Sequence, residues 1–145
     1  MHNSTQSWAQ NQAEKILVVK TIHNQNFDLS ALKNKVVIVV FWADWCSVCR
    51  AEITQLDNLY KKYHQQGLEI IGLNVDGVTK NAQNLSYPIA IFDNAAINNF
   101  DNPKTLPMIY IINKDGSNYS QLYLPEQIAI NNVEKIIKSL LTRAP

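Results

Sequence analysis

The segment Val36–Trp42 constrains the fold of this 145-residue chain more than any other. Its seven residues are all apolar, mostly β-branched or aromatic, and they do not alternate with polar residues. This pattern is typical of a strand that is covered on both faces, at the centre of a sheet. No apolar run in the chain approaches the roughly 18 residues of a membrane-spanning helix, so we expect no membrane span.

A helix is predicted over residues 47–66, a few positions after this strand. Apolar side chains recur there at steps of three and four residues and form one stripe, at Ile53, Leu56, Leu59 and Tyr63. Arg50 and Glu52 fall at the polar positions, where a residue is most often simply solvated. Gly67 follows as a C-terminal stop.

The other elements follow from apolar runs and the residues that interrupt them. Strands are predicted at 16–22, 68–75, 108–112 and 117–124, with an extended segment at 89–92 and a turn at 114–116. Short helices or turns are predicted within 27–32, 76–86 and 95–100. The apolar spacing from Ile130 to Leu141 predicts an amphipathic C-terminal helix.

This order of elements predicts an α/β fold with a central mixed β-sheet flanked by helices on both faces. The length fits one domain, which we expect over residues 15–145. Residues 1–14 are polar and rich in Asn and Gln, and we expect a flexible tail or linker there. No signal-peptide pattern is visible, and this start fits both a protein trimmed of its targeting segment and a cytoplasmic protein.

Charge and cysteine usage narrow the function classes. The net charge is +1 and basic residues are scattered, which argues against binding to nucleic acid. The chain has two cysteines, Cys46 and Cys49, three positions apart. A secreted disulfide scaffold would carry more cysteines at wider spacings. The pair therefore indicates chemistry rather than stapling.

The cysteine pair lies where the central strand hands over to the helix. A helix start has unpaired N–H groups and a partial positive charge, which stabilise a thiolate. Cys46, at the helix start, is the predicted nucleophile, and Cys49, one turn on and less accessible, is the predicted resolving thiol. A purely structural bridge over so short a loop would gain little stability.

A metal site is the other use of two such cysteines. A closed zinc site needs four ligands, and the histidines are single and widely scattered, at His2, His23 and His64. Two thiolates could hold Cu(I), but no methionine or histidine cluster supports this. We expect neither a metal nor a cofactor.

The residues around the pair resemble the thioredoxin-fold superfamily, in its TlpA-like branch. That branch contains bacterial extracytoplasmic thiol–disulfide oxidoreductases, including cytochrome c maturation reductases and ScsD-like proteins. The resemblance runs from residue 27 to the C-terminus, and it is carried by Val39-Val40-Phe41-Trp42-Ala43-Asp44-Trp45-Cys46-Ser47-Val48-Cys49-Arg50-Ala51-Glu52, Phe27-Asp28-Leu29, Gly72-Leu73-Asn74-Val75-Asp76, Tyr87-Pro88 and the stretch from Leu106 to Gly116.

The resemblance implies a thioredoxin-like fold and disulfide exchange with client proteins that bear thiols or disulfides. It also implies a bacterial periplasmic or other extracytoplasmic location, with a membrane redox partner and room for an anchor outside this sequence. Direction cannot be read from Ser47-Val48, because it depends on the relative stability of dithiol and disulfide. Family precedent favours a reductase. The alternatives are a non-catalytic redox sensor or metal-binding thiol module, and, with weaker support, a peroxidase that uses Cys46 alone.

The resemblance also implies further site residues. Pro107 would be a cis-proline that faces the cysteines, and Leu106 would offer backbone groups to an extended substrate peptide. Trp45 would flank the nucleophile on the substrate-contact surface. Val40 stands where thioredoxins usually bury an aspartate. Asp76, just past the next strand, is therefore the candidate proton acceptor for Cys49, with a turn or cap residue as the equal alternative.

Overall fold

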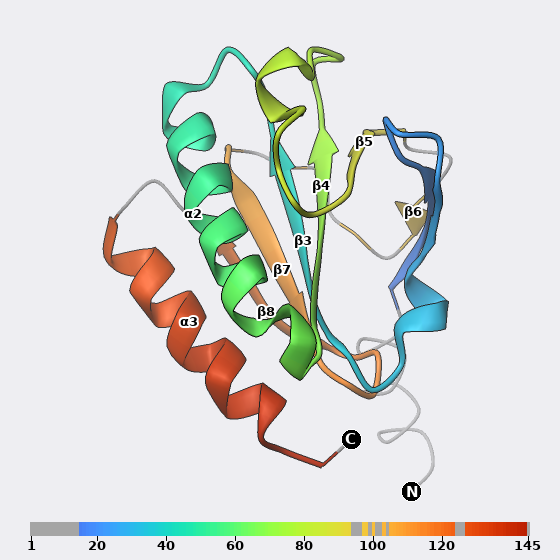
Figure 1. Cartoon of the computed structure of the whole chain (residues 1–145), viewed down its shortest axis with the longest axis vertical. Helices are drawn as coiled ribbons and strands as arrows, with labels where there is room; N and C mark the ends of the chain where they lie inside the picture. Colours follow the sequence, from blue (N-terminus) through green and yellow to red (C-terminus); the bar gives the residue numbers. More distant parts are fainter. Residues whose placement is uncertain are drawn as a thin grey trace, which may run out of the picture.

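The computed structural model describes residues 15–93, 97–98, 100, 103, 105–123 and 127–144. The predicted tail at residues 1–14 lies outside this range. A five-stranded sheet forms the centre (Figure 1), in the order β5 (Ile89–Ile91), β4 (Leu68–Asn74), β3 (Val36–Trp42), β7 (Met108–Ile112) and β8 (Asn118–Tyr123). Strands β3, β4 and β5 are parallel, whereas β7 is antiparallel to β3 and β8. The predicted mixed sheet with a buried central strand is confirmed.

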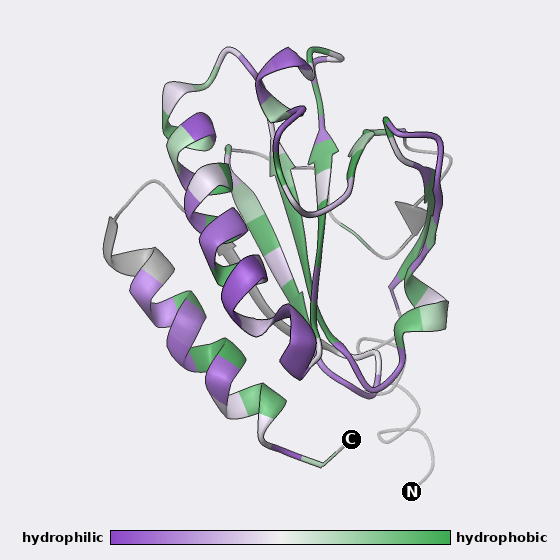
Figure 2. Ribbon diagram, in the orientation of Figure 1, coloured by the Kyte–Doolittle hydropathy of each residue, from purple (hydrophilic) through white to green (hydrophobic). Residues whose placement is uncertain are grey.

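Two helices, α2 (Ser47–Tyr63) and α3 (Gln127–Leu141), cover one face of this sheet (Figure 1). Every second residue of β3, from Val36 to Trp42, packs against them in a core with Cys49, Ile53, Leu56, Val133, Ile137 and Leu140. Hydrophilic residues lie on the outward surface of α2 (Figure 2). A short 3-10 helix, η2 (His64–Gln66), extends α2, and Gly67 ends it at a φ of 111°, as predicted.

The other face of the sheet is covered by strands and a 3-10 helix in the part of the chain that is described. A three-stranded sheet lies there, made of β2 (Asn26–Asp28), β1 (Ile16–Lys20) and β6 (Ile97–Asn98), with the 3-10 helix η1 (Leu29–Leu32). These elements supply the apolar cover that the sheet needs, through Leu17, Phe27 and Leu29. The predicted α/β fold class with a central mixed sheet is confirmed, and on this face the helical element among the described residues is η1.

Strand β6 contradicts the short helix predicted at 95–100. Its residues Ile97 and Asn98 pair antiparallel with Leu17 and Ile16 of β1. Pairing with a strand distant in the sequence therefore decides this segment, over its local helical character. Residues 76–86 contain one 3-10 turn, η3 (Lys80–Ala82). No helix in the described part of the chain is long and apolar enough to cross a membrane.

Strand register brings three loops to one edge of the central sheet. Trp42 pairs with Asn74 in the parallel β3–β4 ladder, so the loops after both strands leave the sheet together. Met108 pairs with Phe41 in the antiparallel β3–β7 ladder, so the residues before β7 arrive at the same edge. This edge therefore gathers residues 43–46, 75–78 and 105–107.

Gly72 of β4 allows the side chain of Trp42 to lie close to the sheet. A Cβ at Gly72 would lie 2.6 Å from Cδ1 of Ile89 and 3.3 Å from both Nε1 of Trp42 and Cε1 of Tyr87. The Ile89 methyl is the end of a flexible side chain, whereas the two aromatic rings are rigid. The absence of a side chain at Gly72 is therefore a packing requirement.

We predict that Gly72→Ala lowers the free energy of unfolding by about 1–3 kcal/mol, because of overpacking. Ile89→Val alone should cost about 0.5–1.5 kcal/mol. The double variant should be less destabilised than the sum of the two, because Val lacks the methyl group that the new Cβ would meet. Urea denaturation measures all three, and strict additivity would contradict this account of Gly72.

Candidate active site

Cys46 and Cys49 lie where β3 gives way to α2, and they form a disulfide with Cα atoms 5.2 Å apart. Cys46 is the N-cap of α2, and its Sγ accepts a hydrogen bond from the N–H of Cys49 at 3.1 Å. Cys46 is half-buried, whereas Cys49 is fully buried. Of the two sulfur-bearing residues, therefore, Cys46 is the one open to an incoming substrate.

The start of α2 favours negative charge on Cys46. No acidic side chain lies in the first turn of the helix. The free N–H groups of that turn and the helix dipole both place partial positive charge at this end. Once the disulfide is reduced, this environment stabilises the thiolate, the form that attacks a disulfide.

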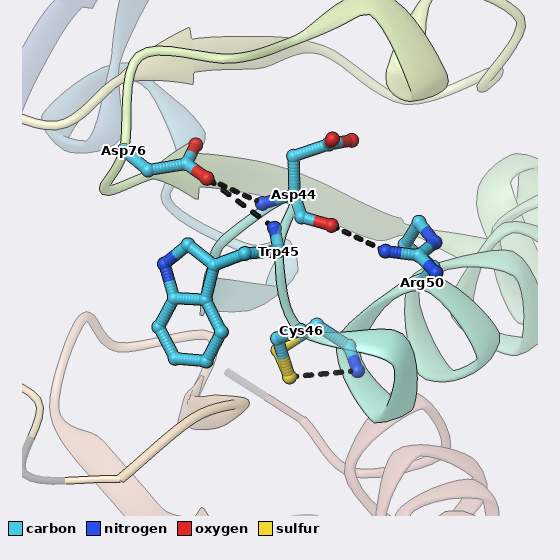
Figure 3. Close-up of a disulfide and its surroundings, with 6 residues drawn as sticks. Asp44, Trp45, Cys46, Arg50 and Asp76 are labelled. Carbon is cyan, nitrogen blue, oxygen red and sulfur yellow. Dashed lines mark hydrogen bonds between the residues drawn. A yellow bond between two sulfur atoms is a disulfide. The ribbon is translucent and has the colours of Figure 1, made fainter.

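The loop that leads into Cys46 is held by Asp76, which lies two residues after β4 (Figure 3). Oδ2 of Asp76 accepts hydrogen bonds from the N–H of Asp44 at 2.9 Å and from the N–H of Trp45 at 3.4 Å. Oδ1 accepts from the N–H of Val78 at 3.0 Å. Both oxygens of Asp76 are thus bonded to backbone N–H groups.

These bonds lower the pKa of Asp76. Burial raises the pKa of its carboxyl, but hydrogen bonds from Val78, from Asn74 and from the loop before Cys46 outweigh burial, so the pKa lies below its ordinary value. A carboxylate with a lowered pKa and occupied oxygens is a poor base. This geometry argues against the proton-acceptor role suggested by the sequence, and it agrees with the alternative of a turn or cap residue.

Glu52 is a buried acid that sequence analysis assigned to the solvated side of α2. It is 5% exposed, and its Oε2 has no hydrogen-bond partner among the described residues. Burial raises the pKa of this carboxyl above its ordinary value. Glu52 lies three residues after Cys49, and side chains at this spacing share one face of a helix. That spacing is the sequence signal that could have identified Glu52.

The Leu106–Pro107 peptide bond is cis, as the resemblance implied. Pro107 is buried, and Leu106 is half-buried against both apolar cores. Because β7 begins opposite the end of β3, this bond lies at the same edge of the sheet as the disulfide. Trp45, next to Cys46, is 71% exposed. The predicted substrate-contact residues are therefore brought to one edge, and their role in binding stays a prediction.

No group of three or more His, Cys, Asp or Glu side chains that could hold a metal ion is found in the described residues. The chemistry available at the site is that of two adjacent cysteines, one half-exposed and one buried, with a buried carboxyl group one helical turn after the second cysteine. Such a set can exchange a disulfide, and can take up or release two electrons and two protons.

Comparison with known proteins supports this chemistry. The chain is 34% identical over 111 residues to the thiol-disulfide oxidoreductase ResA of Bacillus thuringiensis, a match that covers 72% of this chain and 64% of that protein. It is 29% identical over 106 residues to ResA of Bacillus subtilis, covering 68% of this chain and 59% of that protein. The matches thus span less than two thirds of the length of these relatives.

Solved structures show the same fold. A putative thiol:disulfide interchange protein DsbE from Chlorobium tepidum superposes with a TM-score of 0.76 at 20% identity, covering 87% of this chain and 93% of that one. A DsbF homologue from Corynebacterium diphtheriae superposes with a TM-score of 0.70 at 20% identity, covering 88% and 85%. The thioredoxin-like fold is therefore confirmed.

A family model places the chain more firmly than any single relative. The model of the AhpC/TSA family matches residues 10–117, which include the disulfide, Asp76 and the cis-proline. Together with the ResA-like sequence and the thioredoxin-like fold, this match shows that the chain belongs to the AhpC/TSA family.

Proposed function

We propose that this protein is a thiol–disulfide oxidoreductase that exchanges disulfides with client proteins, in the reductase direction. The observation that carries the proposal is the Cys46–Cys49 disulfide at the start of α2, with one half-exposed and one buried cysteine. The names of the ResA relatives support the reaction class. The reductase direction rests on the TlpA-like resemblance.

The reaction begins with the reduced pair. The Cys46 thiolate attacks one sulfur of a client disulfide, a bond forms between Cys46 and that sulfur, and the other client sulfur leaves as a thiolate that takes a proton. Cys49 then loses its proton and attacks Sγ of Cys46. The second client sulfur leaves, and the protein holds the Cys46–Cys49 disulfide. The client has gained two electrons and two protons, and a reducing partner must return two of each to the protein.

Glu52 is the group that we assign as proton acceptor for Cys49. Its carboxylate is buried, has an oxygen with no hydrogen-bond partner among the described residues, and follows Cys49 by one helical turn. A raised pKa makes a carboxylate a stronger base, and burial provides it here. Asp76 is a weaker base than Glu52, because both of its oxygens accept hydrogen bonds and its pKa is lowered.

Trp45, Leu106 and Pro107 form the surface that we assign to the client. The exposed indole of Trp45 offers apolar contact next to Cys46. The backbone of Leu106, ahead of the cis bond and at the edge where the disulfide lies, would pair with an extended peptide. An extended, apolar segment that flanks a disulfide is the kind of client that fits.

The compartment and the donor are parts of the same proposal. We place the protein in the bacterial periplasm or another extracytoplasmic compartment, as the TlpA-like resemblance implies. Disulfides form and persist outside the cytoplasm, so a dedicated reductase finds substrates there. The returning electrons would come from a membrane redox partner.

We predict that the protein catalyses reduction of insulin by dithiothreitol, measured as precipitation of the insulin B chain. Cys46→Ser should abolish this activity, because the nucleophile is lost. Cys49→Ser should accumulate a mixed disulfide with insulin, visible by non-reducing electrophoresis, because resolution is lost. Trapping by Cys46→Ser instead would reverse the two roles. Consumption of hydrogen peroxide without insulin reduction would indicate the peroxidase and contradict the proposal.

We predict that Glu52→Gln slows resolution of the mixed disulfide by about tenfold or more at pH 7. The measurement is the decay of a preformed Cys46 mixed disulfide against pH. The same substitution should not lower the stability of the protein. The pKa of Glu52 is raised in the folded state. Ionisation of its carboxyl therefore reduces stability as the pH rises above the pKa that Glu52 has in the unfolded state. At pH 7 the variant should therefore be at least as stable as the wild type.

Asp57→Asn is the matched control for Glu52→Gln. Asp57 is a second buried acid on α2. Unlike Oε2 of Glu52, its oxygens have partners among the described residues: the N–H of Ser86 donates to its Oδ1 at 2.6 Å, and Nζ of Lys61 lies 3.3 Å from its Oδ2. This variant should lose about 1–3 kcal/mol of stability and keep the wild-type decay rate. Equal slowing in both variants, or no slowing in Glu52→Gln, would refute Glu52 as the proton acceptor.

A further inference from the structure

The loop between β3 and α2 is fixed by side chains from outside it. Within the loop, the N–H of Cys46 donates to the carbonyl of Ala43 at 3.2 Å. The N–H groups of Asp44 and Trp45 donate to Asp76, and the carbonyl of Asp44 accepts from the guanidinium of Arg50 (Figure 3). These backbone N–H and C=O groups of the loop thus have hydrogen-bond partners, and the bonds hold the loop in one conformation.

Asp44 is the residue at which these partners converge. Its N–H is bound by Asp76, from the loop after β4, and its carbonyl by Arg50, from α2. Its side-chain Oδ1 accepts from Nδ2 of Asn81, in η3, at 2.7 Å. The segment 76–82 therefore contacts the loop before Cys46 at two points, one through Asp76 and one through Asn81.

Trp45 depends on this arrangement more than a buried residue would. Trp45 is 71% exposed, so packing does little to fix the indole. Its backbone N–H is instead held by Oδ2 of Asp76, and that bond sets where the side chain leaves the chain. The same loop delivers Cys46 to its N-cap position.

We propose that Asp76 is a positioning residue for disulfide exchange, which holds the Asp44–Trp45 backbone so that Trp45 and Cys46 meet a client together. Asn81 is the second anchor of the same loop. This inference rests on the proposed function and adds residues that act on client binding through Trp45. The expected substrate is a protein client that is large enough to contact the indole of Trp45 and the sulfur of Cys46 at the same time.

The positioning role and the proton-acceptor role predict different outcomes at Asp76. Asn keeps one carbonyl oxygen that can accept from both Asp44 and Trp45, although its amide group faces the N–H of Val78. Asp76→Asn should therefore retain much of the contact, whereas Asp76→Ala loses all of it. A proton acceptor would be lost equally in both variants.

The experiment compares insulin reduction by the wild type, Asp76→Ala, Asp76→Asn and Asn81→Ala. We expect Asp76→Ala to raise KM for insulin about tenfold with kcat changed about twofold or less, and Asp76→Asn and Asn81→Ala to raise KM about two- to threefold. Reduction of the small disulfide 5,5′-dithiobis(2-nitrobenzoate) should change about twofold or less in all variants, because it needs no docking on Trp45.

Asp115→Ala is the matched control. Asp115 also accepts from a backbone N–H two residues on and has a lowered pKa, caused first by the side-chain hydrogen bond of Ser117. It lies in the β7–β8 turn, at the opposite end of the central sheet from the disulfide, because Ile112 pairs with Val37. Its removal should leave both substrates unaffected. An equal rise in KM for insulin in Asp115→Ala would show a non-specific effect and overturn the proposal.

A second measurement tests the contact without any activity. In NMR spectra of the wild type, the amide protons of Asp44 and Trp45 should shift together with pH as Asp76 titrates, below the ordinary pKa of an aspartate. The shift should be markedly smaller in Asp76→Asn and Asp76→Ala than in the wild type, because the carboxylate that accepts from both N–H groups is gone. A wild type that lacks the shift refutes the contact whether or not Asp76→Ala folds.

The outcomes separate this inference from the proposed function. A wild type that does not reduce insulin, yet shows the amide titration, rejects the function and with it the positioning role in exchange. Equal loss of kcat in Asp76→Asn and Asp76→Ala, with KM unchanged, would assign proton transfer to Asp76 and overturn the inference while insulin reduction stands.

Discussion

A sulfur atom caps helix α2, and the active site depends on that contact. Helix N-caps are usually oxygen-bearing side chains, but here Sγ of Cys46 takes the hydrogen bond from the N–H of Cys49. A thiolate is a better acceptor than a disulfide sulfur, so the same N–H group and the helix dipole favour the reduced, reactive form. The same position therefore serves both the fold and the chemistry, and it exists because only four residues separate the end of β3 from the start of α2.

The burial of β3 on both faces makes this position rigid. Its seven residues are all buried, between the α2–α3 layer on one side and the β1–β2–β6 layer on the other. The end of β3 is thus fixed, and the loop that follows is bonded to Asp76, Asn81 and Arg50. In contrast, Oε2 of Glu52 has no hydrogen-bond partner in the described part of the chain. A role in proton transfer would explain this cost to stability.

Local sequence patterns predicted the parts of the fold that depend on local physics. The unbroken apolar run of β3, the stripe of α2 and the stop at Gly67 need no information from elsewhere in the chain. Strand β6 is different, because two residues become a strand only through pairing with β1. The cis bond before Pro107 was predicted from the resemblance, because the sequence alone does not distinguish a cis from a trans proline at the start of a strand.

Sequence patterns located the cysteines and their neighbours, whereas the burial of Glu52 and the partners of Asp76 depend on long-range contacts. Glu52 looked solvated because the apolar stripe was drawn without Cys49, whose own burial widens the inward face of α2. Asp76 was recognised as an acid near the pair, but its partners are backbone groups about thirty positions earlier in the chain. Those contacts follow from the β3–β4 register, which no local pattern contains.

The reduction potential of the Cys46–Cys49 couple tests the central claim most directly. It is measured by equilibrating the protein with dithiothreitol or glutathione buffers and titrating the thiols released. A reductase predicts one reversible two-electron couple near thioredoxin's value, about −270 mV. A value near about −120 mV would mark an oxidant and contradict the direction proposed here. A pair that does not exchange electrons reversibly would contradict the assignment of this disulfide as the working group.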